Sequence, residues 1–266
     1  MKNATTHTRA AAVAGQFYDD NAQQLLTHVL QYIADAKPPL PVTPKALIVP
    51  HAGHIYSGPI AASAYKLLEP IADMIKQVIL LGPSHRVALT GIATPGVDFF
   101  ETPLGKIKIN TSFCQRAEQL DFVSENALAH EYEHSLEVQL PFLQVLLNQF
   151  ELTPLVVGEC NSEDIASLLN LFLGSNDTLI VISTDLSHFH NYSIATRQDR
   201  LTSIAIENLQ PQKISYEDAC GRNPLNGFLT LAKQQQMQVK LLDLRNSGDT
   251  AGDKNRVVGY GAYVAF

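Results

Sequence analysis

Four side chains of the types that bind metal ions each follow a short apolar run in the sequence. They are His51, His85, Asp185 and His188, and the runs are residues 46–49, 78–81 and 179–183. Short runs rich in aliphatic and β-branched residues are typical of buried strands. In an open α/β sheet the carboxyl ends of such strands meet at one edge, where ligands bind. The pattern therefore predicts that these side chains surround one crevice.

The types of these four residues indicate the chemistry of the crevice. Two histidines and one anionic ligand, with open coordination positions, form the centres of many non-haem iron enzymes. The alternative is that each residue only forms hydrogen bonds in its turn, and for any one residue alone this alternative is the stronger. Their recurrence at matching strand ends favours the metal site.

Cys220 adds a sulfur donor to the candidates. It lies beside Arg222 and just before a helix that is predicted to begin near Asn223 and Pro224, since proline suits a first helical turn. A helix N-terminus and a cation both favour the thiolate, which is the form that binds metal or reacts. The two other cysteines, Cys114 and Cys160, fit inert buried thiols.

The segment His130-Glu131-Tyr132-Glu133-His134 matches the H-E-x-x-H pattern of zinc proteases. In those enzymes both histidines lie on one helix face and the glutamate activates a metal-bound water. Here no third ligand stands at the expected spacing and Pro141 follows closely, so the pattern gives little support to a protease. The simplest interpretation is a surface helix start, and a third alternative places Glu133 and His134 in the same pocket as His51.

Composition limits the class of protein. The chain has 266 residues, a formal net charge of -7 and only three cysteines at wide spacing. A negative charge argues against a nucleic-acid-binding protein, and an odd number of cysteines is typical of reduced thiols. No run reaches the roughly 18 apolar residues of a membrane span, and residues 1–7 lack the apolar core of a signal peptide. We therefore expect a cytoplasmic protein with neither nucleic-acid nor membrane partners.

Strands and helices alternate along most of the chain. Helical periodicity covers residues 21–35, 59–68, 111–120, 131–149, 161–173, 193–209 and 223–236. Further strands are predicted at 152–157, 239–244 and 257–264, with an antiparallel hairpin or edge excursion within 91–110. This order predicts one α/β domain, residues 1–266, in which a mixed β-sheet is sandwiched by helices.

Seven groups of residues carry a family resemblance through their order and spacing. They are Pro50–Gly58, Leu81–His85, Thr102–Gly105, Glu133–Pro141, Ser183–Phe189, Cys220–Arg222, and Gly252–Lys254 with Val258–Tyr260. Together they resemble the successive motifs of the Memo family, whose prokaryotic members are also called AmmeMemoRadiSam system protein B. The match begins at Gly15–Tyr18 and covers nearly the whole chain.

The resemblance implies a fold similar to the class III extradiol (LigB-like) dioxygenases. In those enzymes two histidines and a glutamate hold Fe(II), and a further histidine moves protons. By motif, His51 and His85 would be the histidine ligands, and Cys220 stands where Memo proteins supply a thiolate. His188 would be the acid/base group and Asp185 would orient or coordinate. The residues expected to line the pocket are His54, Tyr56, Glu133, His134 and Arg222.

Cysteine in place of glutamate changes the expected chemistry. A thiolate is softer and more electron-donating than a carboxylate, so it favours copper or a differently poised iron. We expect one transition-metal ion, iron or copper before zinc, and a redox or oxygenase-type reaction on a small molecule. The alternatives are a non-catalytic module that binds a peptide or small ligand in the same pocket, and a hydrolase. Family association also suggests AMMECR-like and radical-SAM proteins as partners.

Overall fold

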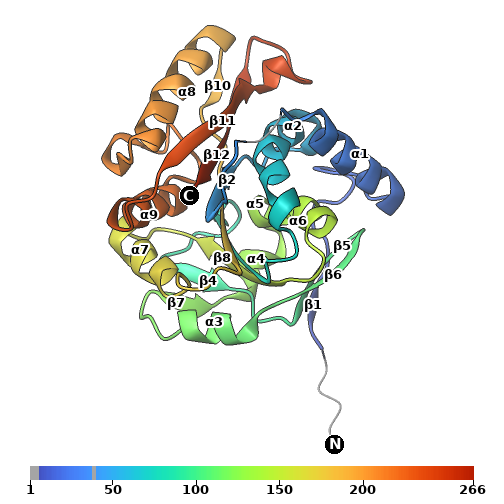
Figure 1. Cartoon of the computed structure of the whole chain (residues 1–266), viewed down its shortest axis with the longest axis vertical. Helices are drawn as coiled ribbons and strands as arrows, with labels where there is room; N and C mark the ends of the chain where they lie inside the picture. Colours follow the sequence, from blue (N-terminus) through green and yellow to red (C-terminus); the bar gives the residue numbers. More distant parts are fainter. Residues whose placement is uncertain (1–5, 38–39) are drawn as a thin grey trace, which may run out of the picture.

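A nine-stranded mixed sheet runs through the molecule and separates two layers of helices (Figure 1). The computed structural model describes residues 6–37 and 40–266. Residues 1–5 and 38–39, which belong to the predicted domain, lie outside the described residues. The arrangement confirms the predicted α/β class with a mixed sheet sandwiched by helices.

Four parallel strands form the centre of this sheet. In spatial order they are β2 (Ala46–Val49), β9 (Thr178–Ser183), β3 (Gln77–Pro83) and β8 (Glu151–Val157). β9 comes much later in the chain than β2 and β3 but lies between them. The carboxyl ends of all four strands therefore point to one edge of the sheet.

Shorter or antiparallel strands complete the sheet on both sides. Beyond β2 lies β12 (Val257–Ala265), which pairs with both β11 (Val239–Asn246) and β10 (His188–His190). Beyond β8 lie β4 (Ile92–Thr94) and β7 (Val123–Glu125). The predicted hairpin is formed by β5 (Phe99–Thr102) and β6 (Gly105–Lys108), which join β1 (Thr8–Arg9) in a separate three-stranded sheet.

The two faces of the central strands bury different cores. In β2, Leu47 and Val49 pack into one cluster, and Ala46 and Ile48 pack into the other. Helices α1, α2 and α6 contact one another on the first side, and α7 and α9 contact one another on the second (Figure 1). Because both faces are covered, the central strands read as continuous apolar runs rather than as alternating ones.

Most helices fall where their periodicity predicts them. The helices are α1 (Ala22–Asp35), α2 (His54–Tyr65), α3 (Thr111–Ala117), α4 (Ala127–Glu131), α5 (His134–Glu137), α6 (Leu140–Leu146), α7 (Ser162–Asn170), α8 (Tyr192–Glu207) and α9 (Arg222–Gln234), with short 3₁₀ turns at Lys66–Ile71, Pro211–Lys213 and Ser247–Asp249. Asn21 caps α1 by accepting hydrogen bonds from the backbone N–H groups of Gln23 and Gln24. Within the described ranges, no helix combines the length and apolar character needed to cross a membrane.

Two predicted helices differ from the structure. The helix expected at 59–68 begins instead at His54, whose backbone N–H donates to the Phe17 carbonyl at 2.7 Å. The helix expected over 131–149 is divided into α5 and α6, and α4 ends at residue 131, the predicted start of that helix. A new helix begins at α5 because the Glu133 side chain caps it, and another begins at α6, where Pro141 occupies the first turn. Proline suits a first turn because a backbone N–H at that position would have no partner within the helix.

Candidate metal centre

Three imidazole rings meet at the carboxyl edge of the sheet. His51 follows β2, His85 follows β3 and His134 begins α5. One ligand atom from each ring lies within 4.8 Å of the others, and this is the only such group among the residues the structure describes. The ring centroids are 5.1 Å apart for His51 and His85, and 4.6 Å apart for His85 and His134. This spacing permits the three rings to bind one metal ion.

A hydrogen-bond chain fixes the orientation of the His51 ring. Its Nδ1 lies 3.0 Å from Ser183 Oγ. That hydroxyl donates its single proton to the Ser135 carbonyl at 2.6 Å and accepts from Gln139 Nε2 at 2.9 Å. The Ser183 hydroxyl must therefore also accept from His51, so Nδ1 carries the ring proton and Nε2 presents its lone pair.

The Glu133 carboxylate orients His85. It accepts from the His85 ring Nδ1 at 2.9 Å and from the His85 backbone N–H at 2.6 Å. Burial raises the pKa of Glu133. The hydrogen bonds from the ring and backbone of His85, the charge of that ring when it is protonated, and the hydrogen bond from the Ser135 N–H outweigh burial and lower the pKa to about 2. Because the ionised carboxylate can only accept, Nδ1 carries the proton in the neutral His85 ring and Nε2 presents its lone pair. A carboxylate behind the ring is the usual partner of a metal-binding histidine.

His134 supplies a nitrogen with no hydrogen-bond partner. Its Nδ1 is buried and lies 3.4 Å from Glu133 Oε1, but the geometry does not make a hydrogen bond. Burial, then the neighbouring His51 and His85, lowers the pKa of His134 to about 4. Burial likewise lowers the pKa of His51 well below its usual value. Neutral, under-bonded imidazoles are the form that metal ions require.

Asp185 and His188 lie beside the three rings. Asp185 is buried after β9 and accepts from the backbone N–H groups of His51 at 2.7 Å and Ala52 at 3.3 Å. Burial raises its pKa. His188 Nδ1 lies 2.8 Å from the Leu186 carbonyl, which can only accept, so its Nε2 is unprotonated in the neutral ring.

Cys220 approaches the cluster from the start of α9. Its Sγ lies 3.3 Å from His51 Nε2 but does not belong to the group of mutually close ligand atoms. The next residue, Gly221, donates its N–H to Thr184 Oγ1 at 2.9 Å. A Cβ at Gly221 would stand 2.6 Å from Thr184 Cβ, so only glycine allows this close approach. The assignment of Cys220 as a ligand stays a prediction.

The protonation of Cys220 differs from the sequence interpretation. Burial, then the Asp185 charge, raises the pKa of the thiol to about 12. Arg222 does not counteract this effect, because its guanidinium lies 3.9 Å over the Tyr216 ring and donates to Asn223. Without metal the sulfur is therefore a neutral thiol, and a metal ion would have to displace its proton.

The three rings open into a cavity of about 470 Å³. Of the residues expected there, the cavity is lined by His51, Tyr56, His85, His134, Asp185 and His188. His54, Glu133, Cys220 and Arg222 are not among its lining residues. His54 points into the core instead, where its Nε2 donates to the Val138 carbonyl at 2.9 Å. Phe17, Arg256 and Tyr260 also line the cavity but were not predicted as lining residues, although Phe17 and Tyr260 lie within segments that match the family.

The H-E-x-x-H segment does not form one helical face. His130 lies in α4, is buried, and donates from Nε2 to the Ala93 carbonyl at 2.9 Å. α4 ends at Glu131 with Tyr132 as its C-cap, and His134 begins a new helix. The two histidines therefore do not form the pair of a zinc protease. His134 lines the same cavity as His51, whereas Glu133 does not line it and binds the His85 ring instead.

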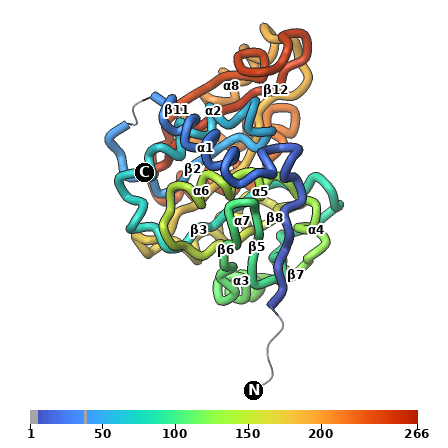
Figure 2. Tube along the Cα trace, turned by 90° about the vertical axis from the view of Figure 1, so that its right-hand side faces the viewer, coloured from blue at the N-terminus to red at the C-terminus, as the bar shows by residue number. Residues whose placement is uncertain are grey.

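A second buried carboxylate ties the N-terminal segment to these helices. The Arg9 guanidinium donates to Glu137 Oε2 at 2.7 Å and to the carbonyls of His130 at 2.6 Å and Glu133 at 2.8 Å. Glu137 also accepts from the backbone N–H groups of Ala12 and Val13 and from the Tyr18 hydroxyl. Figure 2 shows this blue segment running beside β5 and on towards α5. The segment thus fixes the turn that holds Glu133 and His134.

The fold and site together define an α/β protein with a candidate trihistidine metal centre. A family model described as Memo-like protein matches residues 9–264. A MEMO1 family protein of Aquifex aeolicus is 35% identical over 263 residues, covering 95% of this chain and 97% of the relative. A MEMO1 family protein of Thermotoga maritima is 34% identical, covering 97% and 99%. The chain belongs to the Memo-like family.

One solved structure supports the fold alone. It is the crystal structure of an uncharacterized protein, JW3007, from Escherichia coli K12, with a TM-score of 0.50 and 10% sequence identity. The similarity covers 81% of this chain and 98% of that one.

Replacing Arg9 by methionine should lower the free energy of unfolding by about 3–5 kcal/mol, because the Glu137 carboxylate would stay buried without its cation. Urea denaturation of chelator-treated protein measures this. The matched control is Lys108→Met, which removes an exposed ion pair to Glu151 and should change stability by about 1 kcal/mol at most. Equal small losses in both variants would contradict the structural role of Arg9.

The buried histidines predict a loss of stability in acid. Burial lowers the pKa of both His54 and His130 to about 4, whereas an unfolded histidine titrates near 6.5. Between these values the unfolded chain binds protons that the folded chain does not, so stability falls as pH falls through this window, by about 3 kcal/mol per histidine at its lower end.

His130→Gln should therefore show a shallower pH dependence than the unmodified protein, even if it is less stable at pH 7. The control is His7→Gln at an exposed position, which should keep the original slope. The measurement is urea denaturation at a series of pH values from 7 to 4.5. An unchanged slope in His130→Gln would show that this residue does not carry the effect.

Proposed function

We propose that the protein is a mononuclear metal-dependent redox or oxygenase-type enzyme that acts on a small molecule. The observation that carries this proposal is the convergence of His51, His85 and His134 on one cavity wall. Two of these rings are oriented by hydrogen bonds from Nδ1, so that Nε2 presents its lone pair, with the Cys220 sulfur 3.3 Å from that of His51, and the third has an orphaned buried nitrogen. These features fit a metal ion, with Cys220 beside the histidines as the further proposed donor.

The donor set supports iron or copper, with zinc as the next choice. Imidazole suits all three metals, and a thiolate would favour copper or a more electron-rich iron. When bound, the ion would supply a Lewis acid or a redox centre at the cavity wall. The resemblance of the motifs to LigB-like dioxygenases supports the oxidative type of reaction over hydrolysis, as does the broken H-E-x-x-H segment.

The residues around the metal centre suit proton transfer and positioning. His188 lines the cavity and has Nδ1 tied to a backbone carbonyl, so its free Nε2 would accept a proton from a bound substrate and return it later. Asp185 holds the His51 turn through two backbone N–H groups and acts as a positioning residue. Tyr56, with 38% of its surface exposed, stands at the cavity wall.

Protein purified without oxygen or chelator should contain about one equivalent of iron, copper or zinc, because a site of three to four protein donors holds a single ion. His51→Ala and His85→Ala should each remove most of it. Elemental analysis measures the metal, and His7→Ala is the control. His134→Ala and Cys220→Ala then decide which side chain is the third ligand. Unchanged metal content in both the His51 and His85 variants would contradict the site.

His188→Gln should keep its metal but lose oxygen-dependent turnover of a phenolic or other reduced substrate by about 10²- to 10⁴-fold, the usual contribution of an acid/base group. An oxygen electrode with iron- or copper-loaded protein measures this. His190→Gln, on the same strand β10, is the matched control and should stay active. If the loaded protein consumes no oxygen with any such substrate, the non-catalytic binding module becomes the better function.

A further inference from the structure

A second cavity adjoins the metal centre. It has a volume of about 710 Å³ and shares His85 and His188 with the first cavity. Cys220, which lies 3.3 Å from His51, also lines it. A ligand whose head is held at the metal can therefore extend an arm past these residues into the second cavity.

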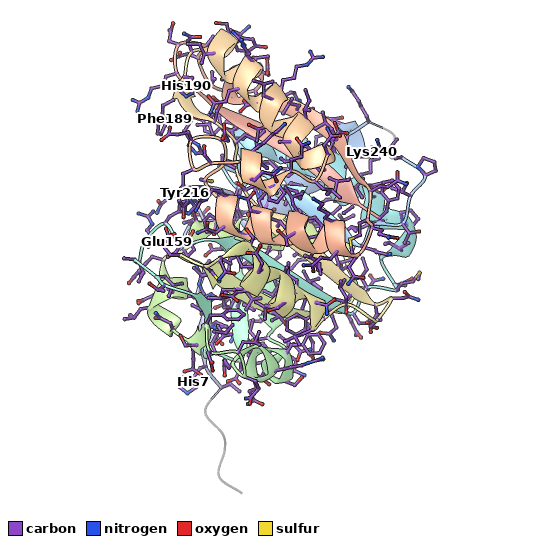
Figure 3. The ribbon with its side chains drawn as sticks, turned by 90° about the vertical axis from the view of Figure 1, so that its left-hand side faces the viewer. His7, Glu159, Phe189, His190, Tyr216 and Lys240 are labelled. Carbon is purple, nitrogen blue, oxygen red and sulfur yellow. The ribbon has the colours of Figure 1, made fainter. Side chains whose placement is uncertain are left out.

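A fixed set of hydrogen bonds builds the far wall of this cavity. The Tyr216 hydroxyl donates to Glu159 Oε1 at 2.8 Å and accepts from Asn223 Nδ2 at 2.8 Å. Asn223 also donates to the Gly158 carbonyl at 2.7 Å and accepts from Arg222. Figure 3 shows Tyr216 and Glu159 along the same edge of the molecule as Phe189 and His190. The wall is thus organised before any ligand arrives, which favours binding.

The lining of the second cavity combines apolar and polar side chains, and it is acidic at this wall. Val87, Leu89 and Pro224 line it together with the Tyr216 ring, one face of which is covered by the Arg222 guanidinium. These apolar side chains suit a flat apolar arm. The charged side chains among its described lining residues are Glu159 and Glu217, and no lysine or arginine is among them. In the described part of the chain, no hydrogen-bond donor is found for Glu159 Oε2.

The first cavity carries side chains of both charge types, because Asp185 and Arg256 both line it. Arg256 lines it, with its guanidinium 4.2 Å above the Phe189 ring. A cationic arm would meet Arg256 in the first cavity, whereas both charged side chains that line the second cavity are acidic and attract it. The two cavities therefore offer a charged ligand two distinguishable orientations.

We propose that the second cavity binds the arm of a substrate that has a metal-binding head and a flat apolar body ending in a protonated amine. Glu159 and Glu217 are the specificity-determining residues for the amine, and Tyr216 supports the body and holds Glu159 in place. This inference rests on the proposed function, because the metal must hold the head.

Two isosteric probes test the proposal with zinc-loaded protein, which avoids redox chemistry. They are 4-(aminomethyl)benzohydroxamic acid and 4-ethylbenzohydroxamic acid, which share the chelating head and ring and differ in the amine. Calorimetric titration should show that the amine binds about 3- to 10-fold more tightly, as expected for two partly exposed ion pairs.

The preference should vanish in the variant Glu159→Gln/Glu217→Gln, while the affinity for the ethyl compound stays unchanged. Glutamine at position 159 still accepts from Tyr216, so the wall is kept. The matched control, Glu69→Gln/Glu163→Gln, changes two carboxylates outside the cavity and should retain the preference.

Equal binding of the two probes, or tighter binding of the ethyl compound, would overturn the proposal, and the second result would place the arm beside Arg256. Loss of binding of both probes in the double variant would also overturn it, since the neutral probe does not need the carboxylates. Failure of both probes to bind the unmodified zinc-loaded protein would instead contradict the open metal site itself.

Discussion

The buried carboxylate of Glu133 is the interaction on which the candidate site depends. It joins the end of β3 to the start of α5, since it binds both the ring and the backbone N–H of His85 and also caps α5 through the Ser135 N–H. His134 follows it directly in the chain. An ionised group without solvent must be fully hydrogen-bonded, so this carboxylate also fixes the relative position of two of the three imidazoles.

Arg9 and Glu137 extend the same principle to the N-terminal segment. The guanidinium binds the backbone carbonyls of His130 and Glu133 as well as the Glu137 carboxylate. It thereby satisfies backbone groups left free between α4 and α5, near the expected start of the predicted long helix, as buried polar groups require. The break has a functional consequence, because an unbroken helix could not direct Glu133 and His134 at the sheet edge.

Burial and charge give the site its chemical character. The buried rings of His51 and His134 have lowered pKa values, so they stay neutral and available to a metal at cellular pH. The thiol of Cys220, by contrast, has a pKa raised to about 12 and needs a metal to ionise. The two cavities that meet at His85 and His188 differ in their charged side chains, with Asp185 and Arg256 in one and Glu159 and Glu217 in the other.

The sequence by itself determined the central strands and most helices, because apolar runs and helical periodicity are local signals. It also predicted His51, His85 and Asp185 at one edge, since parallel strands align their carboxyl ends. Only the tertiary structure decided that β9 lies between β2 and β3, that His134 completes the histidine group, and that His54 and Arg222 point elsewhere. These outcomes depend on contacts between distant segments, such as Glu133 with His85 and Arg222 with Tyr216, which leave no local pattern in the chain.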